Sequence, residues 1–113
     1  MSGAELVSAL NDTISDGYEE IAEFRRAGVD AAKKRAAWKM ALAKEINRLR
    51  TIGTPATLTE TLAKGDPDVA QLEMEYNIAD IECRAAQETV MMRKKEADVI
   101  REQIAREWSG GMV

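Results

Sequence analysis

The pattern of apolar positions is most regular in the second half of the chain, where apolar residues recur at alternating intervals of three and four. This spacing places side chains along one stripe of an α-helix, as at the a and d positions of a coiled coil. It predicts a helix over residues 67–108, with a seam formed by Val69, Leu72, Tyr76, Ala79, Cys83, Ala86, Val90, Ala97, Ile100 and Ile104. Arg93 is the charged residue in this seam, which indicates either a buried ionic partner or a polar device that fixes the helix register.

The first half of the chain has a less regular apolar stripe, but it still predicts a long helix over residues 13–52. Before it, Ser2 and Glu5 have the spacing of a capping box, which predicts a short helix over residues 1–12 and then a break. Gly28 lies among alanines, and we interpret it as a point of close approach between helices.

The segment between the two long helices, residues 53–66, is predicted to be a connector. Thr57 and Glu60 form a second capping-box pattern, which predicts a short helix within it. Asp66 stands at the position where a carboxylate caps the following helix. Residues 109–113 contain paired glycines and are predicted to be a flexible tail.

These elements predict an all-α fold, an antiparallel helical hairpin of two long helices with short N-terminal and connector helices. A length of 113 residues indicates a single domain, and an aromatic content of only 4% indicates a thin core. Two helices bury little apolar surface alone, so we expect a homo-oligomer with coiled-coil character, joined through the seam of the 67–108 helix.

The composition excludes most of the common classes of catalytic site, because the chain has no histidine and a single cysteine, Cys83. Neither an imidazole base nor a cysteine-rich metal site can be assembled from these residues. We therefore expect no enzymatic activity, no cofactor and no metal. The first 24 residues carry six acidic and no basic residues, unlike a signal peptide, and no apolar run is long enough for a membrane span. A cytoplasmic protein with no membrane partner is the expectation.

Charge is strongly segregated along the chain, although the net charge is only −4. Residues 25–50 contain nine basic and two acidic residues, a net charge of +7. Basic side chains around an aromatic ring are what a single-stranded nucleic-acid site needs, because cations release counterions from phosphates and the ring stacks on bases. The candidate nucleic-acid-binding residues are Lys33, Lys34, Arg35, Trp38, Lys39, Lys44, Arg48 and Arg50.

Two other interpretations of the basic segment remain open. Its cations could pair with acidic residues of the 67–108 helix, in the same chain or in an oligomer, with Trp38 in the core. The segment could also bind an acidic protein partner. Under these interpretations the chain is a coiled-coil structural or adaptor protein, such as a phage assembly or regulatory component.

Three features resemble the UvsY family, the small recombination-mediator proteins of T4-type phages. They are the basic helix around Trp38, the segment from Leu62 to Val69, and the long amphipathic helix through Tyr76 and Ile100. The resemblance implies binding to single-stranded DNA, ring formation, and help for a recombinase in displacing a single-strand-binding protein. It also implies that the basic helix lines the DNA path, that the seam forms the oligomer interface, and that the protein acts in the cytoplasm of a phage host.

Overall fold

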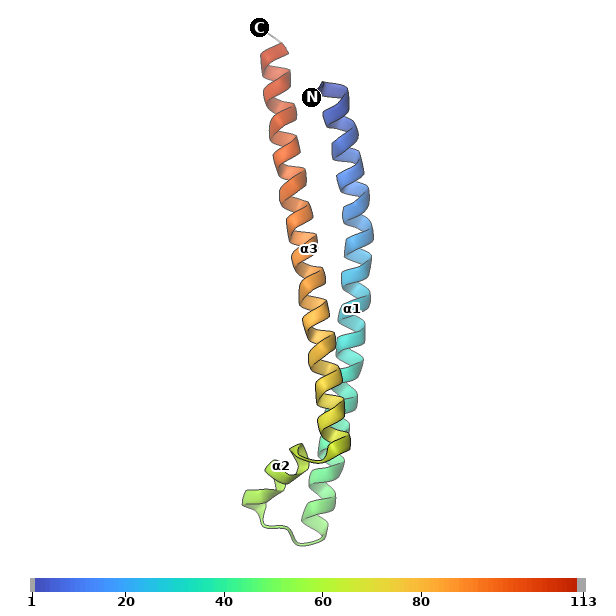
Figure 1. The fold of residues 1–113 in the computed structure, drawn as a ribbon, viewed down its shortest axis with the longest axis vertical. Coiled ribbons are helices and arrows are strands. Elements are labelled where there is room, and N and C mark those ends of the chain that lie inside the picture. Colours follow the sequence, from blue (N-terminus) through green and yellow to red (C-terminus); the bar gives the residue numbers. More distant parts are fainter. Residues whose placement is uncertain (1, 112–113) are drawn as a thin grey trace. The chain divides into compact units, whose positions relative to one another are not determined.

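The computed structural model describes residues 2–111, and these residues form three α-helices and no strand. Helix α1 comprises Gly3–Thr51, α2 comprises Ala56–Lys64 and α3 comprises Pro67–Gly111 (Figure 1). The prediction of an all-α fold is therefore confirmed. Within the described residues, none of the helices is both long and apolar enough to cross a membrane.

Helix α1 begins at the capping box that the sequence predicted. The backbone amide of Ser2 donates to the Glu5 carboxylate at 2.9 Å, and the Glu5 amide donates to the Ser2 hydroxyl at 3.2 Å. The predicted break before residue 13 is wrong, because α1 continues through it to Thr51. Thr13 does not cap a new helix; its hydroxyl donates to Glu96 of α3 at 3.3 Å instead.

The connector turns at Gly53, whose φ of 87° lies in the left-handed region that glycine adopts without strain. Helix α2 then begins directly after Pro55, and no side chain caps it. The predicted second capping box is therefore absent. The hydroxyl of Thr59 donates to the carbonyl of Pro55, and Glu60 pairs with Lys64 at 3.1 Å.

The start of α3 agrees with the prediction. One carboxylate oxygen of Asp66 accepts hydrogen bonds from the backbone amides of Asp68 and Val69, both at 3.2 Å. These bonds satisfy amide groups that the first helical turn leaves without partners. The other end of α3 extends to Gly111, so the predicted tail at 109–113 is helical over its first part, and residues 112–113 lie outside the described residues.

The contacts of the chain form two compact units. The terminal unit combines the part of α1 up to Arg25 with the part of α3 from Arg84 onward, and the connector unit comprises Arg26–Cys83. In each unit the segments of α1 and α3 run in opposite directions. In the terminal unit, for example, residue 13 meets residue 96 and residue 20 meets residue 93.

The connector unit contains the main apolar core. Its buried members come from all three helices: Leu42, Leu49, Ala63 and Val69. Trp38, Ala41 and Ile46 of α1 pack against them. Gly28 does not mark the expected close approach, because a Cβ atom built there would lie 3.8 Å from the Cys83 sulfur, an ordinary contact distance.

Candidate functional site

Two of the predicted nucleic-acid-binding cations are already paired within α1. The Lys34 ammonium lies 3.0 Å from the Asp30 carboxylate, and this hydrogen bond raises the pKa of Lys34. The Arg48 guanidinium lies 2.6 Å from Glu45, which raises the pKa of Arg48 and lowers the pKa of Glu45. These two side chains are therefore partly neutralised by neighbours three or four residues away.

The five other cations of the predicted site are exposed, and none has a carboxylate partner within the described part of the chain: Lys33, Arg35, Lys39, Lys44 and Arg50. Four residues rotate a helix by slightly more than one turn and eleven by about three turns. Arg35, Lys39 and Arg50 therefore form one row, which we call the Arg35 row, while Lys33 and Lys44 form a second row on another part of the surface.

Trp38 is half-buried and belongs to the packing of the connector unit. Its ring stacks on Tyr76 of α3, with centroids 5.6 Å apart and an angle of 13° between the planes. The Lys39 ammonium lies over the same ring, 4.3 Å from its centroid. The indole nitrogen Nε1 is buried without a hydrogen-bond acceptor. Because the ring already has these neighbours, a nucleic-acid base could stack on it only after displacing one of them.

The seam of α3 faces the interior of each unit. All ten of its apolar side chains are buried or half-buried. Val69 belongs to the core cluster with Leu42 and Leu49, and Tyr76 stacks on Trp38. The residues that the sequence predicted as an oligomer interface therefore pack within the chain and leave little surface for a second copy.

Arg93, the charged residue of the seam, has an ionic partner, which was one of the two interpretations of its position. Its guanidinium binds the Glu20 carboxylate through two nitrogens, at 2.7 and 3.1 Å, and Glu96 at 2.9 Å. Asp16 lies 4.0 Å away. The hydrogen bond to Arg93 lowers the pKa of Glu20, and the same bond raises the pKa of Arg93. We call these four residues the Arg93 cluster. The periodic pattern located Arg93, but no sequence signal identified Glu20 as its partner.

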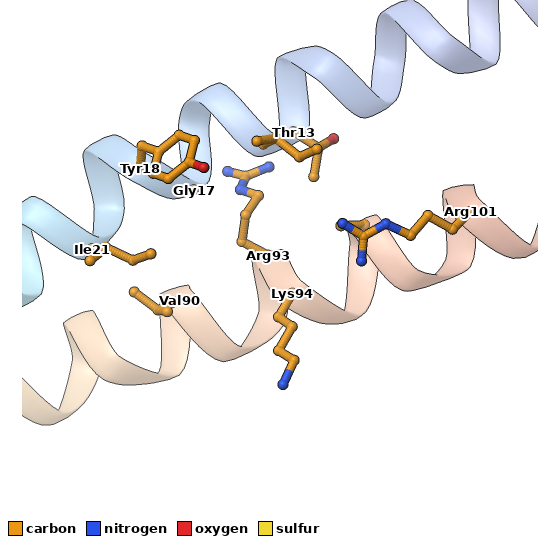
Figure 2. A pocket seen from close by; sticks show the side chains of 10 residues that line it. Thr13, Gly17, Tyr18, Ile21, Val90, Arg93, Lys94 and Arg101 are labelled. Carbon is orange, nitrogen blue, oxygen red and sulfur yellow. The ribbon is translucent and has the colours of Figure 1, made fainter.

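Beside the Arg93 cluster lies a groove of about 240 Å³ between α1 and α3 of the terminal unit (Figure 2). Ile14, Ile21 and Val90 give it an apolar wall. Figure 2 shows the Arg93 side chain directed toward α1 and the Lys94 side chain directed away from it. The cation in the seam is therefore used for helix packing, while its neighbour Lys94 is exposed.

Comparisons of this chain with protein-family models, with curated proteins and with solved structures find no match.

Proposed function

We propose that this protein is a non-enzymatic accessory factor that binds single-stranded nucleic acid, of the recombination-mediator type. The observation that supports the proposal is the Arg35 row, three exposed cations of one helix without a carboxylate partner in the described residues. The Arg35 row contacts phosphates, and Lys33 and Lys44 add to the local positive potential. Trp38 supports the row by holding α1 against Tyr76, and it is not a stacking platform for bases.

The geometry suits a flexible single strand. At a rise of about 1.5 Å per residue, Arg35 and Lys39 are roughly 6 Å apart along the helix axis, and Arg50 lies roughly 16 Å beyond Lys39. A single strand can adjust its backbone to such a row, because its phosphates are not fixed by a duplex. Contacts made only by cations neutralise phosphates and do not read bases, so we expect binding with little sequence preference.

In the same proposal, the mediator acts in the cytoplasm beside a recombinase and a single-strand-binding protein. Charge-only contacts are weak at physiological salt. Such a protein therefore needs an oligomer that multiplies its contacts along the strand.

The direct test is fluorescence anisotropy of a labelled single-stranded oligonucleotide, titrated with the protein at low salt. The variant Arg35→Ala/Lys39→Ala/Arg50→Ala should lose most of the affinity. The variant Lys94→Ala/Lys95→Ala/Arg106→Ala removes the same charge from exposed positions of the terminal unit and serves as the matched control. Equal losses in both variants, or no binding by the folded wild-type protein, would contradict the proposal.

A second candidate function, a structural or adaptor protein, is favoured by the surface of α2. This helix buries Thr59 and Ala63 but exposes the larger side chains of Leu58 and Leu62, which are 50% and 51% accessible. Exposed leucines one turn apart are typical of a surface that contacts another protein. Leu58→Ser/Leu62→Ser should change the free energy of unfolding by less than about 1 kcal/mol, because both side chains are already accessible. A larger loss would show that these leucines serve the fold.

A further inference from the structure

The outer face of α3 in the connector unit carries exposed apolar side chains. Met74, Ile78 and Ile81 are 49%, 49% and 66% accessible. They recur at intervals of four and three, so they lie on one line along the helix, which we call the α3 strip. Met74 and Ile78 each lie two positions from Tyr76, and two residues rotate an α-helix by about 200°. The α3 strip therefore faces away from the stack of Tyr76 on Trp38.

The outer face of α1 in the same unit carries a second strip. Val29 and Met40 are 54% and 68% accessible, and Ala36 and Ala43 are also exposed. These four residues follow one another at intervals of seven, four and three, and we call them the α1 strip. Ala36 and Met40 each lie two positions from Trp38, so the α1 strip also faces away from the aromatic stack. Because α1 and α3 meet through this stack, the two strips lie on opposite sides of the connector unit.

The two strips have opposite charges beside them. Lys33 and Lys44 lie along one flank of the α1 strip, about three turns apart, and neither has an ion-pair partner among the described residues. Glu75 and Glu82 lie along one flank of the α3 strip, about two turns apart, and neither forms a salt bridge in the described part of the chain. Two strips of the same kind would bring like charges together, whereas an α1 strip packed on an α3 strip brings lysines beside glutamates.

We propose that copies of this chain associate head to tail, with the α1 strip of one copy packed on the α3 strip of the next and the two helices antiparallel. The occupant of each strip is a second copy because one unit supplies both complementary surfaces. All residues of the contact belong to the connector unit. The contact goes beyond the proposed function, since it uses no cation of the Arg35 row. Because the strips lie on opposite sides of the unit, a pair of copies still has one free strip of each kind, and association continues beyond two copies.

Side-chain sizes fit one register of this contact. When Ala36 is placed opposite Ile81 of the second copy, Ala43 comes opposite Met74, because the members of each strip are seven positions apart. Each of these two large side chains of the α3 strip thus meets an alanine. Met40 fills the space between the two contacts, as a knob does between its neighbours.

The charges fit the same register. Lys33 comes within two positions of Glu82 of the second copy, and Lys44 comes within two positions of Glu75, which is roughly 3 Å along the helix axis. The lysine flank and the glutamate flank lie on the same rotational side of their strips, and antiparallel packing brings such flanks together. Each contact therefore contains two lysine–glutamate pairs beside the apolar strip.

Sedimentation equilibrium tests the association, with 12.5 kDa expected for one copy and a wild-type mass that rises with concentration beyond twice this value. Ala36→Glu/Met40→Glu blocks the α1 strip, because the new carboxylates face the glutamates of the second copy. Ile78→Gln/Ile81→Gln blocks the α3 strip by removing its apolar side chains. Each variant alone should stay at 12.5 kDa, and an equal mixture should stop at a one-to-one dimer, because one intact strip of each kind remains. A wild-type chain that stays at 12.5 kDa or stops at twice that mass, or a mixture that does not dimerise, would overturn the proposal.

Charge reversal tests the pairing of the flanks. Lys33→Glu/Lys44→Glu should weaken the association about tenfold, because both pairs of each contact become like-charge contacts. Adding Glu75→Lys/Glu82→Lys to the same chain restores opposite charges, and the association should recover. A fourfold variant that stays as helical as the wild type but fails to recover would refute the pairing.

Two controls separate this contact from general effects of the substitutions. Met91→Gln/Trp108→Gln removes two exposed apolar side chains from α3 of the terminal unit and should associate as the wild type does. Circular dichroism of every variant should show wild-type helicity, because the replaced side chains lie outside the buried core. Loss of association in the Met91→Gln/Trp108→Gln control, with helicity unchanged, would contradict the placement of the contact on the connector unit.

Disulfide cross-linking tests the register in a Cys83→Ala background. A chain with Ala36→Cys, mixed with a chain with Ile81→Cys, should give a cross-linked dimer under mild oxidation. Replacing the second chain by one with Met74→Cys places the thiol on the same strip but seven residues away, and it should cross-link at least about tenfold more slowly. Equal or faster cross-linking through position 74 would refute the register. None of these measurements uses nucleic acid, so the contact between copies and the proposed function can fail separately.

Discussion

Replacing Trp38 separates its role in packing from a role in binding. Replacing a fully buried tryptophan by alanine lowers the free energy of unfolding by about 3–5 kcal/mol. For a half-buried tryptophan the expected loss is about 2 kcal/mol. The lost stacking on Tyr76 adds about 1 kcal/mol. Trp38→Ala should therefore destabilise the chain by about 3 kcal/mol, measured by urea unfolding followed by circular dichroism at low and high protein concentration.

Trp38→Phe provides the internal comparison. Phenylalanine keeps a ring against Tyr76 and removes the indole nitrogen, which is buried without an acceptor. A buried donor without a partner lowers the stability of the folded state by about 1–3 kcal/mol. Removing this donor therefore offsets the stability lost with the smaller contact area of phenylalanine. Trp38→Phe should stay within about 1 kcal/mol of the wild type, and so should Trp108→Phe, whose ring is 69% accessible. A Trp38→Ala variant as stable as the Trp108→Phe control would refute the assignment of Trp38 to the core.

Further predictions concern the Arg93 cluster and the helix ends. Arg93→Ala should lower the unfolding midpoint in thermal melts, because it leaves Glu20 and its acidic neighbours together without their cation. The folded-state pKa of Glu20 is lowered, so its contribution to stability is present at neutral pH and is lost as the pH falls through that pKa. The difference in melting temperature between wild type and Glu20→Gln should therefore shrink from neutral pH to about pH 3; an unchanged difference would contradict the ion pair. Gly28→Ala should stabilise by about 0.5–1 kcal/mol in urea unfolding, because the new methyl group would lie 3.8 Å from the Cys83 sulfur; destabilisation would show that the helices cannot accept it. Ser2→Ala should cost about 1 kcal/mol and speed amide exchange in the first turn of α1, whereas unchanged exchange would show that the capping box is not formed in solution.

Features encoded by local sequence were predictable. The capping box at Ser2 and the Asp66 cap depend on residues within a few positions of each other, and both have the expected hydrogen bonds. The periodicity of α3 likewise identified the residues that are buried or half-buried. In each case a short spacing determines the geometry, so the pattern is sufficient.

Features that depend on distant segments were not predictable in the same way. The break before residue 13 was expected from the local sequence, in which Thr13 could cap a new helix. Instead the Thr13 hydroxyl donates a hydrogen bond to Glu96, a residue 83 positions away. The sequence left open whether Trp38 is accessible or lies in the core, because its ring stacks on Tyr76, a residue of another helix. The same limit applies to the cations, since the sequence could not say which of them find a carboxylate. In the structure Lys34 and Arg48 pair with carboxylates, whereas the cations of the Arg35 row do not.

The salt dependence of oligonucleotide affinity tests the central claim most directly. For single strands, the slope of log affinity against log salt is about −0.7 for each phosphate that a cation neutralises. If the Arg35 row contacts three phosphates, Arg35→Ala/Lys39→Ala/Arg50→Ala should reduce the magnitude of the wild-type slope by about 2. The control Lys94→Ala/Lys95→Ala/Arg106→Ala should leave it unchanged. A slope that is the same in the wild type and the Arg35-row variant would contradict a phosphate-binding role for these cations.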